Sequence, residues 1–288
     1  MLSLEESYAL CDKITAERAR NFHFAFSVLP KERYKGICAL YSFTRTADDL
    51  SDDENDPGKA LENARRWRET FDAALAGDTS RHAIMPAVAD TFARCKIPPE
   101  FMHDLITGTE MDARQNRYPA WADTYLYCYR VASVIGMMTI HVFGFDDPRA
   151  IPLAEKMGIA FQMTNILRDI KEDAERNRIY LPLEDLAARG ISEAQFLACE
   201  NTPALRKLIQ FETDRAWAHY EEGQALIPMI YPESRDALGS LVAIYKRLLE
   251  EIKRRDYDVF SKRVSLSATE KLSLAAGMAW KKFLKFGS

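Results

Sequence analysis

The stretch FQMTNILRDIKEDAERNRIYLP, residues 161–182, decides how the chain folds. Its polar side chains recur every three or four residues and therefore share one helical face: Gln162, Asn165, Asp169 and Asp173. Phe161, Ile166 and Ile170 lie off this face and can bury the helix. The polar line is therefore either the water side of a surface helix or one wall of a polar site.

A second acidic pair stands near the end of another helical segment, YSFTRTADDLSDD at residues 41–53. Asp48 and Asp52 are four residues apart, so both carboxylates project from one side of the helix. Carboxylates at a helix C-terminus face the negative end of the helix dipole, and like charges at this spacing repel, at a cost of about 0.2–1 kcal/mol for each effect. A solvated helix end would explain one such cluster. Because the chain contains the DxxxD pattern twice, we interpret both as functional.

The two acidic pairs offer hard oxygen ligands, which suit Mg²⁺ bound to phosphate oxygens better than they suit Zn²⁺. The expected ligand is therefore a diphosphate. Four arginines lie near the motifs and could clamp its oxygens through their planar forks: Arg20, Arg45, Arg168 and Arg178. Taken singly, each of these residue types is more often found in a surface salt bridge.

The rest of the chain consists of helical patterns separated by proline and short polar clusters, with almost no strand pattern. A capping box of Ser3 and Glu6 opens the first predicted helix, which runs toward residue 20. Further helices are predicted from Pro30, after Asp56, around Pro86, after Pro98, over 121–143, over 152–175, after Pro182, Pro203 and Pro232, and near the C-terminus. No internal repeat or Gly/Ser-rich linker is present. The sequence thus predicts one all-α domain over residues 1–288, built as a large helical bundle.

The composition excludes several classes of protein. With 288 residues, 47% hydrophobic and 28% charged, the chain is typical of a packed globule. A net charge of -4 provides no basic field, so no nucleic-acid partner is expected. Five cysteines without a CxxC pattern predict neither a disulfide framework nor a zinc site. The N-terminus lacks the pattern of a secretory signal, and the apolar run at 131–145 is shorter than the roughly 20 residues of a spanning helix, so a cytoplasmic protein is predicted.

The C-terminal segment is basic and aromatic: Trp280, Lys281, Lys282, Phe283, Lys285 and Phe286. It could make a peripheral contact with the inner face of the membrane. A solvated last helix is the alternative that we favour. The sequence leaves the oligomeric state open.

These motifs resemble those of the squalene and phytoene synthases, the head-to-head prenyl synthases, over essentially the whole chain. Residues 41–53 resemble the first aspartate-rich motif of that family, and residues 161–182 resemble the second. YLYCYRVASVIG at 125–136 is similar to the tyrosine-containing segment between them, and GTEMDARQNRY at 108–118 and AIYKRLLEEIKRRDY at 243–257 match in the same order. The resemblance implies an isoprenoid synthase fold around a central apolar cavity.

The resemblance also implies an activity: a prenyltransferase that joins two allylic prenyl diphosphates at their C1 carbons. It assigns Mg²⁺ binding to Asp48, Asp52, Asp169 and Asp173. It assigns diphosphate contacts to Arg20, Arg45, Arg168 and Arg178, places Gln162 and Asn165 beside the metal, and places Tyr41 and Tyr129 at the reacting centre with Arg45.

The chain departs from the family pattern at a few positions. Ala19 and Asn21 stand where the family usually has small polar residues, which puts hydroxyl contacts to phosphate in doubt, although Asn21 can still donate. Thr44 replaces the usual cysteine before Arg45, and Ser51 replaces an apolar residue within the first motif. None of these changes removes a predicted metal ligand.

Ionisation of an allylic diphosphate needs a neutralised leaving group and a dry apolar pocket around the cation. Aromatic faces could stabilise that cation: Phe22, Phe26, Tyr41 and Tyr129. For the phenylalanines, ordinary packing is an equal alternative. The final proton could pass to Tyr129, Tyr41 or the released diphosphate. Reduction to squalene would need NADPH, and because the chain has no GxGxxG after a strand, this cofactor stays open.

The choice of substrate depends on finer similarities in sequence. RVASVIG at 130–136, QFETDRA at 210–216 and FSKRVSLSATEKL at 260–272 are most similar to bacterial hopanoid-pathway presqualene diphosphate and squalene synthases. We therefore expect C1'-2-3 condensation of two farnesyl diphosphates to presqualene diphosphate, with onward reduction to squalene left open. Phytoene synthase, acting on two geranylgeranyl diphosphates, is the alternative. A non-catalytic assembly factor of the same family is the alternative of another class, and the presence of all four aspartates argues against it.

Overall fold

The protein is described here by a computed structural model that covers residues 2–18, 26, 28–52, 56–267, 269–270 and 273, without the side chains of Ser51 and Asp52. Over these residues the chain is helical, and its only β-type pairings are two isolated bridges, Arg117 with Ile179 and Phe145 with Ile230. The prediction of an all-α protein is confirmed. The predicted last helix and its aromatic residues from Trp280 to Phe286 lie outside the described residues.

The chain forms two compact units. Unit 1 contains Met1–Arg114, Val134–Ile151 and Leu226–Leu238, and unit 2 contains Gln115–Ser133, Pro152–Ala225 and Gly239–Ser288. Both units are therefore assembled from segments that are far apart in the sequence. A single domain over residues 1–288 stays a prediction.

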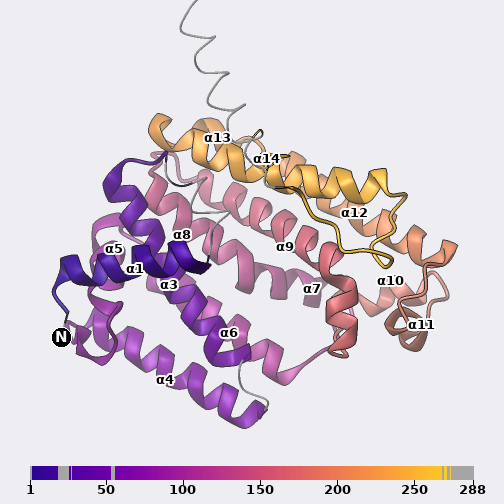
Figure 1. The fold of residues 1–288 in the computed structure, drawn as a ribbon, viewed down its shortest axis with the longest axis horizontal. Coiled ribbons are helices and arrows are strands. Elements are labelled where there is room, and N and C mark those ends of the chain that lie inside the picture. The colour runs from indigo at the N-terminus through magenta and orange to yellow at the C-terminus, as the bar shows by residue number, and fades with distance from the viewer. Residues whose placement is uncertain are drawn as a thin grey trace, which may run out of the picture. The chain divides into compact units, whose positions relative to one another are not determined.

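Unit 1 is built around helix α3. Its elements are α1 (Leu4–Arg18), α3 (Lys31–Asp52), α4 (Pro57–Leu75), the 3-10 turn η1 (Thr79–Arg81), α5 (Met85–Cys95), α6 (Pro99–Arg114), α8 (Val134–Phe143) and α13 (Leu226–Met229). Helix α3 contacts α1, α4, α5, α6 and α8 (Figure 1). Phe43 on α3 is fully buried, and its ring lies 4.8 Å from Trp67 and 5.4 Å from Phe71 of α4. This aromatic core fixes the helix that ends in the first acidic motif.

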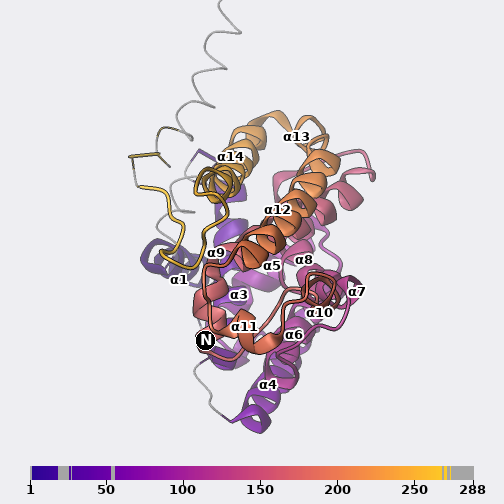
Figure 2. The same ribbon diagram turned by 90° about the vertical axis from the view of Figure 1, so that its right-hand side faces the viewer.

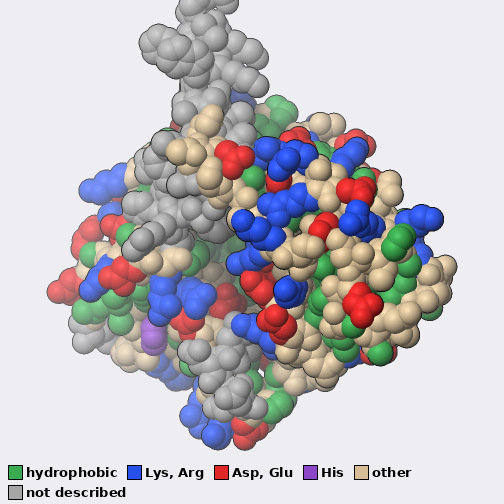
Figure 3. Space-filling model, turned by 45° about the vertical axis from the view of Figure 1, so that its right-hand side comes forward, with side chains coloured by type: hydrophobic (Ala, Val, Ile, Leu, Met, Phe, Trp, Pro, Cys, Tyr) green, Lys and Arg blue, Asp and Glu red, His purple; other side chains and the backbone are tan. Residues whose placement is uncertain are grey.

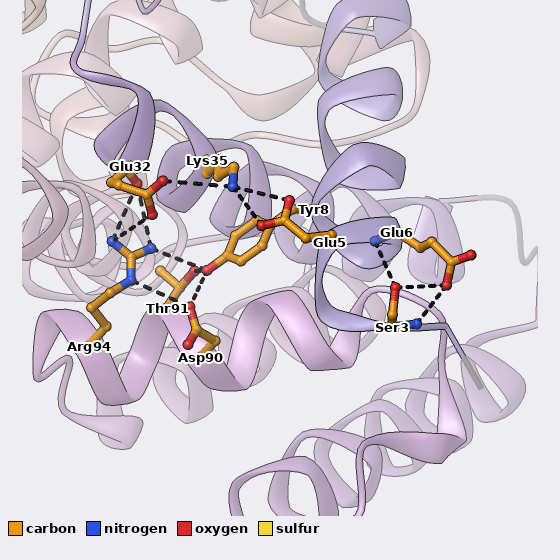
Figure 4. Close-up of polar contacts among 9 residues, drawn as sticks. All are labelled: Ser3, Glu5, Glu6, Tyr8, Glu32, Lys35, Asp90, Thr91 and Arg94. Carbon is orange, nitrogen blue, oxygen red and sulfur yellow. Dashed lines mark hydrogen bonds and ion pairs between the residues drawn. The ribbon is translucent and has the colours of Figure 1, made fainter.

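Helix α1 begins where the sequence predicts it. The Ser3 hydroxyl accepts from the Glu6 amide at 3.3 Å, and the Glu6 carboxylate accepts from the Ser3 amide at 2.8 Å, which is the predicted capping box. The buried Tyr8 hydroxyl donates to Asp90 of α5 at 2.6 Å, and Lys35 of α3 donates to Glu5 at 3.2 Å (Figure 4). These contacts tie α1 to both α3 and α5.

Unit 2 contains the helix with the second acidic motif. Its elements are α7 (Trp121–Cys128), the π-helical turn η2 (Tyr129–Ser133), α9 (Ala150–Glu175), α10 (Leu183–Ala187), α11 (Glu193–Leu197), α12 (Pro203–Gly223) and α14 (Pro232–Arg254), of which α9 and α14 begin in unit 1. Helix α9 packs against α12 and α14 (Figure 2). Thr164 of α9 and Tyr220 of α12 share a hydrogen bond of 2.9 Å, and the Phe161 ring stacks on Tyr245 of α14 at 4.4 Å.

The predicted regular helix over 121–143 is wrong in one detail, because the π turn Tyr129–Ser133 interrupts it. Such a turn accommodates an additional residue while the apolar pattern continues, so periodicity alone did not predict it. By length and composition the stretch Trp121–Phe143 could cross a membrane, with a mean hydropathy of 1.3 in its most apolar window. Half of that window is buried inside the structure, which is typical of a core helix in a globular protein.

Charged side chains of both signs lie together on the face of the molecule in Figure 3. Ion pairs near the end of α14 have the same character, since Arg247 lies 3.8 Å from Glu250 and Arg254 lies 2.6 Å from Glu251. These pairs neutralise charge locally at the end of α14.

A buried charged cluster joins α10 and α12. Glu212 is fully buried, and Arg215 donates to it at 2.7 Å and to Asp185 at 2.9 Å. Burial raises the pKa of Glu212 to about 8, with Arg215 opposing the shift and the Asp185 carboxylate adding to it. The folded state therefore retains a proton on Glu212 that the unfolded chain loses near pH 4.5.

This difference predicts a pH-dependent stability. Because the folded-state pKa is raised, the contribution of Glu212 is fully present below about pH 4.5 and is lost as the pH rises to about 8, at about 1.4 kcal/mol per pH unit. Glu212→Gln should flatten this decline in the free energy of unfolding, measured by urea titration between pH 5 and pH 8. Glu222→Gln, an exposed carboxyl on the same helix, is the matched control and should keep the slope. Equal slopes for all three proteins would show that Glu212 is not the titrating group.

Candidate active site

The polar face of α9 is not the water side of the helix. Its four side chains are only half-exposed: Gln162, Asn165, Asp169 and Asp173. The residues between them, among which Met163, Ile166 and Ile170 are buried, hold the helix in the core of unit 2. Partly buried carboxylates and amides need partners, because desolvation without a hydrogen bond or counter-charge is costly. The polar face is thus partly shielded from water, and a polar site on it stays a prediction.

Asp169 is held by two arginines. Arg168 donates to both carboxylate oxygens, from Nε at 2.8 Å and from Nη2 at 2.6 Å, and Arg263 donates from Nε to Oδ1 at 2.9 Å. Burial alone would raise the pKa of Asp169, but the two guanidinium groups outweigh it and hold the pKa below its usual value. Asp169 is therefore ionised at neutral pH, with its charge balanced by two guanidinium groups.

Two residues beside this face were not among the predicted site residues. Arg263 follows α14 in the chain and also lies 3.3 Å from Glu172. Tyr245 of α14 stacks on Phe161, and burial raises its pKa while Arg168 and Asn165 oppose the shift. Both belong to segments that resemble the family, 243–257 and 260–272, but neither segment contains a spacing pattern that points to a site.

The two amides of the polar face share one hydrogen bond and leave one amide oxygen without a partner in the described part of the chain. Asn165 Nδ2 donates to Gln162 Oε1 at 3.3 Å, which fixes the orientation of the Asn165 side chain. Asn165 Oδ1 is buried and finds no hydrogen-bond partner among the residues that the structure describes. A buried amide oxygen left in this way is a suitable ligand for a hard cation.

The first acidic motif lies at the end of α3 in unit 1. Arg45 forms an ion pair with Asp49, and Asp48 is exposed. The Asp52 side chain lies outside the described residues. Burial raises the pKa of the half-buried Tyr41, with Arg45 opposing the shift. Arg45 Nε is buried without a hydrogen-bond partner in the described part of the chain, so it could donate to an anionic oxygen.

The remaining predicted residues are spread over both units. Tyr129 begins the π turn η2, and Arg178 donates to the Tyr180 hydroxyl at 3.3 Å. Phe26 is buried and meets Phe143 edge-on at 6.3 Å, as expected of a packing residue. The predicted substrate contacts Arg20, Asn21 and Phe22 lie outside the described residues.

The donor set of α9 fits Mg²⁺ better than a softer metal. No group of three or more His, Cys, Asp or Glu that could hold a metal is present among the described side chains. Mg²⁺ usually takes only one or two protein carboxylates and completes its octahedron with water and substrate phosphates. Asp169, Asp173 and the unpartnered oxygen of Asn165 match that requirement. The residues present therefore fit a magnesium–diphosphate ligand, to which the arginines would also donate.

Comparison with known proteins identifies the family of the chain. Residues 15–270 match the model of the squalene/phytoene synthase family. A phytoene synthase of Arthrospira platensis is 35% identical over 283 residues, which cover 93% of this chain and 90% of that protein. A 15-cis-phytoene synthase of a Synechocystis strain is 33% identical over 290 residues, which cover 96% of this chain and 86% of that protein.

Two solved structures resemble most of the chain. A dehydrosqualene synthase in complex with a ligand superposes with a TM-score of 0.88 at 29% identity and covers 98% of both chains. The squalene synthase HpnC from Alicyclobacillus acidocaldarius superposes with a TM-score of 0.83 at 27% identity, covering 88% of this chain and 96% of that one. The chain therefore belongs to the squalene/phytoene synthase family and has the isoprenoid synthase fold.

Proposed function

We propose that this protein joins two prenyl diphosphates head to head and that its preferred substrate is geranylgeranyl diphosphate, which would give phytoene. The observation that carries the reaction class is the half-buried face of α9, where carboxylates, amides and arginines meet. Support for the C20 substrate comes from relatives at 33% and 35% identity, which are named phytoene synthases. The C15 substrate favoured by the wording of the sequence becomes the second candidate.

A specific observation keeps farnesyl diphosphate as that second candidate. Two of the solved structures that superpose on the chain are named dehydrosqualene synthase and squalene synthase. Their identities of 29% and 27% are lower than those of the phytoene synthases above, so they weigh less in the choice of chain length. The metal-binding chemistry is the same for both substrates.

The residues of α9 would perform the polar half of the reaction. Asp169, Asp173 and Asn165 would hold Mg²⁺, which when bound neutralises the charge that develops on the departing diphosphate. Arg168 already lies in a fixed orientation against Asp169 and could donate to phosphate oxygens with little rearrangement. Gln162 keeps Asn165 oriented. These groups would stabilise the negative charge that forms on the diphosphate as the allylic C–O bond breaks, and so favour the cleavage.

The protonation state of Tyr41 bears on which group accepts the final proton of the reaction. Burial raises the pKa of Tyr41, so its phenol is neutral at physiological pH and can donate a hydrogen bond but is a poor base. We therefore favour the released diphosphate over Tyr41 as the acceptor of the final proton. An NADPH-dependent step forms no part of this proposal.

Chain-length preference separates the two candidates. Purified protein with Mg²⁺ should turn over geranylgeranyl diphosphate with a kcat/KM at least about 10-fold above that for farnesyl diphosphate, a difference of about 1.4 kcal/mol in transition-state binding. The measurement is competition between the two labelled diphosphates, with product identification by mass spectrometry. A preference for the C15 diphosphate would overturn the C20 assignment while leaving the reaction class intact.

The role of Asp169 can be compared with that of a neighbouring carboxylate in the same ion-pair cluster. Asp169→Asn keeps the shape of the side chain but removes its charge. Losing an outer-sphere partner of a metal ligand typically costs about 10–100-fold, so losing a direct ligand should lower kcat/KM by about 100-fold or more. Glu172→Gln is the matched control, because this exposed carboxylate also pairs with Arg263 but is not among the predicted metal ligands. It should change kcat/KM by less than about threefold. Full turnover by the Asp169→Asn variant in saturating Mg²⁺ would refute the metal assignment.

A further inference from the structure

The π turn η2 rests on α9 at one point of very close approach. A Cβ atom placed on Gly158 would lie 2.4 Å from Ser133 Cα and 2.7 Å from Ser133 N, distances that real side chains do not reach. Because the obstructing atoms are backbone, they cannot rotate away as a side chain would. Only glycine at position 158 therefore permits this contact between η2 and α9.

Polar contacts hold the same junction together. The buried Ser133 hydroxyl donates to the backbone carbonyl of Glu155 at 2.8 Å, and the Tyr125 hydroxyl donates to the Glu155 side chain at 2.5 Å. Lys156 lies over the Tyr125 ring at 5.5 Å. One turn of α9 thus contacts α7 at Tyr125, before the π turn begins, and the last residue of the π turn, Ser133.

Gly158 also lies on the polar face of α9. It precedes Gln162 by four residues and Asn165 by seven, so the face that ends in Asp169 and Asp173 begins at the glycine. The contact with η2 is therefore one helical turn away from the amides that orient the proposed metal site. Tyr129, which the resemblance places at the reacting centre, is the first residue of that π turn.

A π turn is a suitable element for such a purpose. It inserts about one residue into a helix and so changes the direction of neighbouring side chains by about 100°, and such turns occur frequently at functional sites. It is also intrinsically less favourable than an α-helical turn, so contacts outside the helix have to maintain it. Here those contacts are the Gly158 approach and the Ser133 hydrogen bond.

We propose that Gly158 and Ser133 are positioning residues, whose backbone contact fixes the π turn carrying Tyr129 at a set place along the polar face of α9. This inference rests on the proposed function, because Tyr129 matters only if the protein is a prenyl synthase. The contact itself does not depend on that function, and it can be measured separately.

The test compares two glycine-to-alanine variants. Gly158→Ala introduces the clash with Ser133, whereas Gly223→Ala approaches the same turn of α9 from α12 without that clash, its Cβ lying 3.2 Å from Met157 and from the Leu153 carbonyl. Gly158→Ala lies inside α9 and favours helix formation by about 1 kcal/mol, so helix propensity cannot explain faster exchange in that variant. Ser133→Ala is a milder third variant that removes the hydrogen bond to Glu155 without adding bulk, in case Gly158→Ala does not fold.

Hydrogen exchange measures whether the contact holds the π turn in place, and kinetics measure the effect of the contact on turnover. Peptides covering residues 129–133 should exchange at least about 10-fold faster in Gly158→Ala, and measurably faster in Ser133→Ala, than in Gly223→Ala. The kcat of Gly158→Ala should fall about 10- to 100-fold with KM changed less than about threefold, because misplacing a reacting group by about 1 Å has that effect on turnover.

Each outcome decides one question. Unchanged exchange at residues 129–133 in both Gly158→Ala and Ser133→Ala would overturn the contact. Faster exchange with a kcat equal to that of Gly223→Ala would overturn the positioning role. Absence of turnover in the unmodified protein would contradict the proposed function instead, and the exchange data would still test the contact.

Discussion

The structure depends on one electrostatic constraint: a half-buried helical face that carries carboxylates and amides must be given counter-charges. On α9 the two guanidinium groups around Asp169 supply them and keep the pKa of that carboxylate low despite its burial. The Asn165 oxygen is left without a partner in the described part of the chain. A face that is both charged and incompletely satisfied is costly for stability alone, which is why we read it as a binding surface.

The rest of unit 2 follows from the need to hold that face in place. Apolar residues of α9 pack between α12 and α14, and the stacked rings of Phe161 and Tyr245 join α9 to α14 beside the polar line. Gly158 lets the π turn approach the helix from a third direction. Rigid packing on several sides limits the motion of the polar groups, and such preorganisation is what electrostatic catalysis requires.

Much of this could be predicted from the sequence because it depends on local rules. The capping box at Ser3, the helix starts at proline and the shared face from Gln162 to Asp173 all follow from residue type and spacing. The π turn could not be predicted, because the apolar pattern runs through it without a break. The contact of Arg263 with Asp169 could not be predicted either, because the two residues are 94 positions apart in the sequence and spacing carries no information over that range.

The pairing within the first motif was also beyond the sequence. Arg45 could have paired with either Asp48 or Asp49, and the choice of Asp49 depends on how α3 packs in unit 1. Chain length is a question of a different kind, since the metal motifs are common to C15 and C20 enzymes. For chain length, the names of the relatives favour the C20 substrate, which the motif sequences had ranked second.

The central claim is that the polar face of α9 binds a magnesium–diphosphate and that its departure drives the joining of two prenyl chains. The most direct measurement is the ratio of diphosphate released to joined product formed from labelled geranylgeranyl diphosphate, with Mg²⁺ and with a chelator. Our account predicts two diphosphates for each C40 hydrocarbon, and neither product when the metal is chelated. Diphosphate release without a joined product, or release unaffected by the chelator, would contradict it.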